Sequence, residues 1–266
     1  IIYDAVIAPA PVGNEEYFKK FVADKADLIV PLGTEASMEA KKVAEGTGIP
    51  VIFGLAFVEE TGLIENVLTP GDNITGVRFP TTECALGRLE ILHAIVPQAK
   101  RIWIPYLKDY PTVAPQLRVM ESEASTLNIT LMGMPFTSPA EVKTYLDTLT
   151  TSGDIGMDAI IMIAEPFTLT PEVTDLVFKF AQDYRLPIVS AYITKENYGP
   201  IASFYPTNTK FGNLAAHLAD KVLKGTPAGA IPVVTADNDL RINYKYIQKL
   251  GLQVSEDLLS LSLIHI

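Results

Sequence analysis

Residues 27–56, DLIVPLGTEASMEAKKVAEGTGIPVIFGLA, contain the unit that decides the fold of this chain. Two short apolar runs, 27–33 and 50–56, enclose a segment of helical period at 35–45. The apolar runs are continuous rather than alternating, which is typical of parallel strands covered on both faces. The stretch therefore predicts a strand, a helix and a second, parallel strand.

The same alternation of strand and helix recurs along the rest of the chain. Further strands are predicted at 1–8, 74–79, 101–107, 129–135, 158–165, 186–192, 199–207 and 231–235, and further helices at 14–24, 82–96, 112–127, 139–151, 171–184 and 209–224. Helix starts are marked by a capping box with proline at the first helical position, Ser138-Pro139-Ala140-Glu141, and by Thr170-Pro171. Strands and helices that alternate this often predict an α/β fold with parallel sheets.

The predicted strands are divided between two lobes. One open sheet of roughly ten strands would lie near the upper limit of size, so two sheets of about four to six strands each are expected. The break is expected near 96–100, and a later block of sequence is expected to return to the first lobe. We therefore expect a first lobe of residues 1–98 and 197–230 and a second lobe of residues 99–196 and 231–266, joined by several crossings.

Composition limits the classes of function. The 266 residues are 48% hydrophobic and carry a formal net charge of −10. The apolar content suits large buried cores and argues against disorder. The acidic balance argues against nucleic acid or an anionic membrane as the main partner. No apolar run reaches the ~18 residues of a membrane span, no signal peptide is visible, and the single cysteine, Cys84, excludes an internal disulfide.

The motifs of common enzymes and metal sites do not occur. The chain has no phosphate-binding G-x-x-x-x-G-K-[ST] motif, no G-x-G-x-x-G motif between a strand and a helix, and no G-x-S-x-G hydrolase elbow. His93, His217 and His265 are scattered, so a metal site is not expected. The sequence therefore points to binding rather than catalysis, with no cofactor and no metal.

The turn-rich stretch PGDNITGVRFP, residues 70–80, allows three interpretations. Asn73-Ile74-Thr75 matches a glycosylation acceptor, but such triplets are frequent by chance. A phosphate loop would need a lysine and a following helix. The remaining interpretation is a turn that reverses the chain and leads into a strand.

Candidate binding residues lie where the predicted strands end, because ligand sites of open parallel sheets form at the carboxyl edge. Gly33, Thr34 and Glu35 join a strand to a helix whose free amides and positive dipole end would suit a carboxylate. The other candidates at strand ends are Ala56, Phe57, Phe79, Tyr106, Phe136, Glu165, Phe167 and Tyr192. Glu165 could hold an ammonium group, and the aromatic rings could cover an apolar body.

Each candidate also has a purely structural alternative. Thr34 could serve only as the N-cap of its helix, and any single aromatic ring could belong to the core. Taken together, however, the residues describe a site for a small zwitterion. An amino acid with an aromatic or branched side chain fits that description.

Taken in order, the motifs resemble the ABC-transporter solute-binding protein family of the tryptophan/tyrosine-binding type. The resemblance runs from residue 1 to about 258. It rests on six stretches: KADLIVPLGTEASMEAKKVAEGTGIPVIFGLAF, GLIENVLTPGDNITGVRFP, PQAKRIWIPY, LPIVSAY, YGPIASFYPTNTKFGNLAAHLADKVLKGTPAGAIPVV and LRINYKYIQKLGLQV. It implies a type I periplasmic-binding-protein fold whose two lobes close on a ligand about a hinge. It also implies a monomer outside the cytoplasm, periplasmic or lipid-anchored, that serves a membrane permease with a separate ATPase.

The sequence departs from the family pattern at three places. Relatives begin with one more strand and helix, so the chain is expected to lack the first strand and helix of its first lobe. Phe57-Val58-Glu59 stands where relatives often have Asp-Pro, and Glu165 stands where they often have Asp. Two other functions stay open: a ligand-sensing domain of a regulator or receptor with the same fold, and an α/β isomerase or racemase.

Overall fold

The computed structural model describes residues 4–6, 15–153, 155–192 and 197–265. The chain forms two compact units, each assembled from separated segments. Unit 1 comprises Ile1–Pro80 and Pro206–Asp237, and unit 2 comprises Thr81–Tyr205 and Asn238–Ile266. The chain therefore passes from one unit to the other three times, after Pro80, Tyr205 and Asp237. Among the described residues, no helix is long and apolar enough to cross a membrane.

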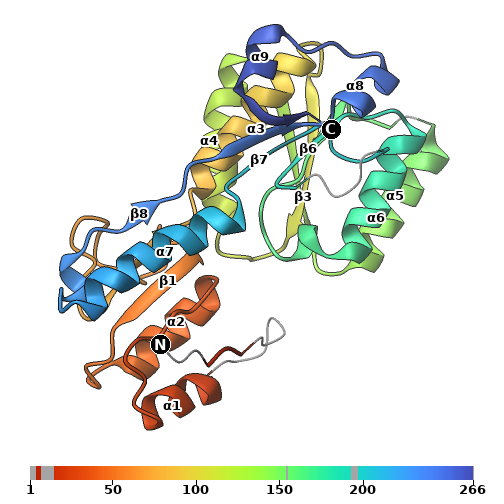
Figure 1. The fold of residues 1–266 in the computed structure, drawn as a ribbon. Coiled ribbons are helices and arrows are strands. Elements are labelled where there is room, and N and C mark those ends of the chain that lie inside the picture. The colour runs from red at the N-terminus through yellow and green to blue at the C-terminus, as the bar shows by residue number, and fades with distance from the viewer. Residues whose placement is uncertain (1–3, 7–14, 154, 193–196, 266) are drawn as a thin grey trace. The chain divides into compact units, whose positions relative to one another are not determined.

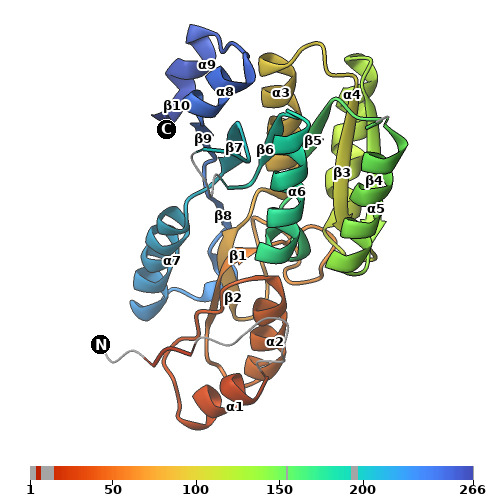
Figure 2. The same ribbon diagram turned by 90° about the vertical axis from the view of Figure 1, so that its right-hand side faces the viewer.

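Unit 1 is a small parallel sheet with helices on both faces. The strands β1 (Val51–Ala56), β2 (Ile74–Arg78) and β8 (Val234–Thr235) lie in the order β1-β2-β8. The helices α1 (Glu15–Ala23) and α2 (Thr34–Ala44) lie on one side of β1, and α7 (Asn208–Leu223) lies on the other (Figures 1 and 2). A short 3-10 helix, η2 (Ala228–Ala230), precedes β8. Buried side chains from α1, α2, β1 and β2 form the core of this unit, including Phe18, Ala40, Phe53 and Ile74.

Unit 2 contains a seven-stranded sheet in the order β10-β9-β7-β6-β5-β3-β4. The strands are β3 (Arg101–Leu107), β4 (Thr130–Phe136), β5 (Ala159–Ile161), β6 (Ile188–Ser190), β7 (Ala202–Tyr205), β9 (Asp239–Ile242) and β10 (Ser262–His265). All pairs are parallel except β7 with β9, which run antiparallel. Both units are thus α/β, as the sequence predicts.

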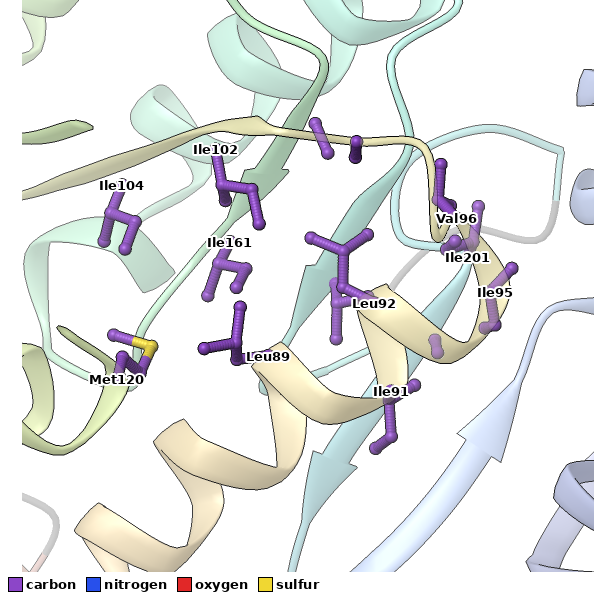
Figure 3. Packing of buried hydrophobic residues seen from close by; sticks show 14 of the residues in the cluster. Leu89, Ile91, Leu92, Ile95, Val96, Ile102, Ile104, Met120, Ile161 and Ile201 are labelled. Atoms are coloured by element: carbon purple, nitrogen blue, oxygen red, sulfur yellow. The ribbon is translucent and has the colours of Figure 1, made fainter. Parts of the chain in front are cut away.

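The sheet of unit 2 is covered on both faces. Leu89, Leu92 and Met120, from α3 (Thr81–Ile95) and α4 (Val113–Thr126), pack against Ile102, Ile104 and Ile161. Figure 3 shows the side chains of Leu89 and Leu92 pointing toward Ile161 and Ile102. The opposite face, which includes Trp103 and Ile160, packs against α5 (Pro139–Ser152) and α6 (Pro171–Asp183). Because successive residues of β3 and β5 face opposite layers, residues 102–105 of β3 and all of β5 are continuously apolar.

The structure ends with a segment whose elements the sequence analysis left unassigned. After β9 the chain forms α8 (Tyr244–Leu250), α9 (Glu256–Leu261) and β10. Asn243 begins α8 by accepting a hydrogen bond from the amide of Tyr246, and Gly251 ends it in the left-handed conformation. Ser262–His265 contribute the backbone of β10, an edge strand beside β9.

One strand prediction differs from the structure. The predicted strand 27–33 is reduced to isolated parallel bridges from Ile29 to Val51 and from Leu32 to Gly54. The predicted strand 1–8 lies mostly outside the described residues.

The boundaries of the units also differ from the expected lobes. Helix α3 belongs to unit 2, whereas residues up to 98 were assigned to the first lobe. The physical reason is that α3 buries its apolar side chains against α4, β6 and β7 of unit 2. The later crossings fall after Tyr205 and Asp237 instead of at 197 and 230.

Candidate functional site

The loop between the bridged segment 29–32 and α2 forms the first part of the candidate site. Gly33 has a φ of 93°, a conformation that favours glycine, and its amide donates to the carbonyl of Gly54 at 2.9 Å. Helix α2 begins at Thr34, so Gly33 occupies the N-cap position. The prediction that Thr34 caps the helix is therefore wrong. Its Oγ1 accepts a hydrogen bond from the amide of Phe57 at 3.0 Å, which ties two predicted site residues together.

The end of β1 is bent at the same place. The pairing of β1 with β2 shifts register between Gly54 and Ala56, and Leu55 has a φ of 55°. Such a bulge redirects the residues that follow it. Here it leads into Ala56, which is buried, and Phe57, which is half-buried. Glu35 is exposed in the first turn of α2.

Three phenylalanine rings form an aromatic cluster in unit 1. The rings of Phe57 and Phe79 meet edge to face at a centroid distance of 5.4 Å. Phe79 also lies 6.2 Å from Phe211 of α7. Phe79 is only 2% exposed, and its amide donates to the carbonyl of Ala56. Phe79 therefore anchors the cluster, and the half-buried Phe57 is its more accessible ring.

An ion pair stands beside this cluster. Nη1 of Arg78 lies 2.6 Å from Oε1 of Glu59, and Nε of Arg78 donates to Oγ1 of Thr235 at 2.8 Å. Glu59 belongs to the segment where the sequence departs from the Asp-Pro pattern. The structure engages its carboxylate with Arg78 of the neighbouring strand. The sequence analysis did not identify Arg78, because the pairing depends on how β1 and β2 lie in the sheet.

In unit 2, Glu165 is buried and bonded to the backbone. Its two carboxylate oxygens accept hydrogen bonds from the amides of Phe167 at 2.8 Å and Thr168 at 2.9 Å, at the start of the 3-10 helix η1 (Phe167–Leu169). Burial raises the pKa of Glu165, although these hydrogen bonds act in the opposite direction. The carboxylate thus stabilises the chain reversal after β5.

The predicted aromatic candidates of unit 2 divide between core and surface. Phe136 and Phe167 are 4% and 8% exposed and belong to the apolar cluster around Trp103. Tyr106 is half-buried and packs against the other cluster. Core packing therefore accounts for Phe136 and Phe167, and Tyr106 keeps an accessible part.

Tyr192 is the candidate with the most distinctive surroundings. Its ring lies 4.4 Å from that of Tyr205, and the two hydroxyl groups share a hydrogen bond. Burial raises the pKa of both phenols. Tyr192 also lines a cavity of about 370 Å³ within unit 2, together with Met162, Thr168, Leu169, Pro171, Thr174, Asp175, Phe178 and Ser190.

The structure thus gathers the sequence-predicted residues into two groups. Gly33, Thr34, Ala56, Phe57 and Phe79 lie together in unit 1. Glu165 and Phe167 lie together in unit 2. Phe211 and Tyr205 were missed, because Tyr205 lies within the predicted strand 199–207 and Phe211 within the predicted helix 209–224. Among the described residues, no group of three or more His, Cys, Asp and Glu side chains could hold a metal ion.

Comparison with known proteins places the chain in a family. The sequence profile described as ABC transporter substrate binding protein matches residues 15–266. The tyrosine-binding protein of Clostridioides difficile strain R20291 is 26% identical over 240 residues. The match includes 88% of this chain and 66% of that relative, so the chain spans slightly less than two thirds of the relative's length.

Solved structures share the fold. The ABC domain from Streptococcus pneumonia in complex with L-Trp gives a TM-score of 0.79 at 22% identity, with 95% of this chain and 83% of that chain covered. The ligand-free, open structure of a substrate binding protein with adhesive properties from Clostridium difficile gives 0.71 at 22% identity, with coverage of 92% and 80%. These likenesses support the predicted type I periplasmic-binding-protein fold. Because the family profile spans nearly the whole chain, this protein belongs to the ABC transporter substrate binding proteins, which bind a substrate and are not enzymes.

Proposed function

We propose that this chain is the extracytoplasmic solute-binding component of an ABC importer and that it captures a small zwitterionic amino acid with an aromatic or branched side chain. The family match supports the class of protein. The ligand class is supported by a relative that is a tyrosine-binding protein and by a structure of the same fold in complex with L-Trp.

The observation that carries the ligand class is the aromatic cluster of Phe57, Phe79 and Phe211 beside the start of α2. Aromatic rings stack on one another at centroid distances of about 4.5–7 Å, so the half-buried Phe57 offers a partner for an aromatic side chain. The first amides of α2 have no acceptor within the helix, so they can donate hydrogen bonds to polar groups of a ligand. Unit 1 therefore offers an aromatic amino acid a ring to pack against and backbone hydrogen-bond donors.

The mechanism we propose is hinge closure. The three chain connections between the units are the natural hinge, since a few residues at element ends can absorb the change in backbone angles. A ligand that contacts both units favours the closed form, and it shifts the equilibrium only by its preference for that form. A membrane permease with a separate ATPase would then recognise the closed form, with the protein in the periplasm or lipid-anchored at the cell surface.

A thermal-shift screen against amino acids, purines and sugars tests this proposal. A ligand at 100 times its dissociation constant adds about 2.7 kcal/mol to the free energy of unfolding. We expect the largest rise in melting temperature with an aromatic or branched amino acid. A rise with a sugar or a nucleobase, and with no amino acid, would overturn the proposed ligand class.

A further inference from the structure

Arg88 is a buried charged residue on the apolar inner face of α3. Its inward neighbours along the helix are Cys84, Ala85, Leu89 and Leu92, all fully buried, and Arg88 is itself 0% exposed. Arginine is rarely buried without a partner, because removing a guanidinium group from water costs several kcal/mol. Its position therefore calls for an anionic or strongly polar counterpart.

Among the described residues, the structure provides a hydrogen-bond acceptor for only one of the three guanidinium nitrogen atoms. Nη2 of Arg88 donates to the carbonyl of Phe204 at 3.1 Å. Nε and Nη1 have no hydrogen-bond partner, and no carboxylate in the described part of the chain pairs with this guanidinium. Burial lowers the pKa of Arg88, whereas Cys84, Tyr205 and Tyr192 act to raise it. None of these neighbours is a carboxylate, so no acidic side chain of the described residues pairs with the guanidinium.

The groups around Arg88 can bind an anion together with it. Arg88 donates to the carbonyl of Phe204, the residue before Tyr205, and the ring of Tyr205 lies 4.4 Å from that of Tyr192. The Tyr192 hydroxyl is a hydrogen-bond donor. Tyr192 also lines the cavity of about 370 Å³ in unit 2, where Thr168, Thr174 and Ser190 add hydroxyl groups. Tyr192 is thus common to the cavity and to the surroundings of Arg88.

We propose that Arg88 is the cationic centre of a carboxylate-binding subsite in unit 2, reached from the cavity at Tyr192. A carboxylate suits the unfilled donors Nε and Nη1, since a charge-assisted hydrogen bond is about twice as strong as a neutral one. The inference that this carboxylate belongs to an amino acid rests on the proposed function. A free carboxylate such as formate would use the same donors.

The first test needs no knowledge of the physiological ligand. The melting temperature of the wild type is measured in sodium formate and in sodium chloride at equal ionic strength. We expect a saturable rise of about 2–4 °C in formate over chloride, and we expect Arg88→Gln to lose it. Arg118→Gln, at an exposed arginine of α4, is the matched control and should respond like the wild type. An equal response of Arg88→Gln and the wild type would overturn the proposal.

If Arg88→Gln does not fold, the proposal can still be tested by measuring the melting temperature of the wild type in formate, formamide and chloride. Formamide has the size of formate without its charge. A formate rise that exceeds the formamide rise supports the subsite, whereas equal effects of formate, formamide and chloride would overturn it.

The second test asks whether the carboxylate comes from an amino acid. Calorimetry compares L-tyrosine with tyramine, which lacks the carboxylate. We expect the wild type to prefer L-tyrosine roughly 10- to 100-fold, and Arg88→Gln to prefer it less than about 3-fold. If both proteins show the same preference, the proposal fails and the proposed function stands. If formate stabilises only the proteins with Arg88 and no amino acid binds, the subsite stands and the proposed ligand class fails.

Discussion

The two units differ in how their aromatic and polar side chains are packed and paired. In unit 1 the residues beyond β1 and β2 are phenylalanines that contact one another, and the polar groups there are paired: Thr34 with the amide of Phe57, and Arg78 with Glu59. Unit 2 holds buried polar groups instead. Glu165 is bonded to backbone amides, and Arg88 keeps two nitrogen atoms without a partner.

Under the proposed function, this difference would give the two units different roles in ligand recognition. Paired polar groups and packed rings make a rigid apolar surface, which suits the body of an aromatic ligand. Buried polar groups with unfilled bonding capacity are costly, and such groups call for a ligand, an ion or water. If both proposals hold, unit 1 would recognise the shape of the ligand and unit 2 would recognise its charge.

The largest effect is expected when Phe79 is removed from the aromatic cluster of unit 1. Phe79→Ala deletes a ring that is 2% exposed and packed between Phe57 and Phe211, so it should lower the free energy of unfolding by about 3–5 kcal/mol. Urea denaturation measures this loss. Tyr17→Ala, at a residue of α1 that is 43% exposed, is the control and should cost less than about 1 kcal/mol. Similar losses in both variants would show that the cluster is not a packed element.

A pair of glycine substitutions compares the packing of the two units. A Cβ at Gly76 would lie 2.3 Å from the carbonyl oxygen of Phe53, which is backbone of the adjacent strand, so Gly76→Ala should cost about 3 kcal/mol. A Cβ at Gly87 would lie 2.4 Å from the ring of Phe204, a half-buried side chain that can rotate. Gly87→Ala also gains about 1 kcal/mol of helix propensity, so its net cost should be near 1 kcal/mol. Thermal denaturation measures the loss of stability in both variants. A larger loss for Gly87→Ala than for Gly76→Ala would contradict the described packing.

Glu165 in unit 2 provides a test that depends on pH. A raised pKa means that the folded chain holds the proton more tightly than the unfolded chain. The stability contributed by Glu165 is therefore full below its ordinary pKa of about 4.3 and is lost as the pH rises through the folded-state value. Glu165→Gln cannot titrate and offers one acceptor oxygen for two amides, so it should be less stable by about 1–3 kcal/mol at low pH.

The gap between Glu165→Gln and the wild type should shrink as the pH rises above about 4.3. Urea denaturation at a series of pH values measures it. Glu172→Gln, at an exposed residue in the first turn of α6, should follow the wild type at every pH. A gap that widens with pH would contradict the direction of the shift.

The smallest effect is expected at Thr34 of unit 1. Thr34→Val keeps the shape of the side chain and leaves the amide of Phe57 without its acceptor, which should cost about 1 kcal/mol. Thr34→Ser keeps the hydroxyl and should restore most of that stability in the same thermal melt. Equal losses in the two variants would assign the effect to the methyl group instead of the hydrogen bond.

Helices and parallel strands are predictable here because their signals are local. Ser138 accepts from the amide of Glu141 and Pro139 is the first helical residue, so α5 begins where the capping box predicts. The antiparallel strand β9 gave no such signal, because its partners β7 and β10 are distant or irregular in sequence. The division after Pro80 depends on which unit buries α3, and that is a property of tertiary packing.

The candidate site was predictable as a set of strand ends but not as a set of contacts. Sequence alone could not show that the amides of Phe167 and Thr168 donate to the carboxylate oxygens of Glu165. It also could not show that the N-cap of α2 is Gly33 instead of Thr34. Arg88 did leave a signal. It stands at the spacing of Ala85, Leu89 and Leu92, so the amino-acid pattern by itself marks a charged residue on an apolar helix face.

Calorimetric titration of the wild type with L-tyrosine and L-tryptophan, and with myo-inositol as the comparison, tests the central claim most directly. The account predicts saturable binding of one amino acid per chain with a negative heat-capacity change, since the aromatic cluster buries apolar surface of the ligand. It predicts no measurable heat with myo-inositol. Saturable binding of myo-inositol, with no heat from either amino acid, would contradict it.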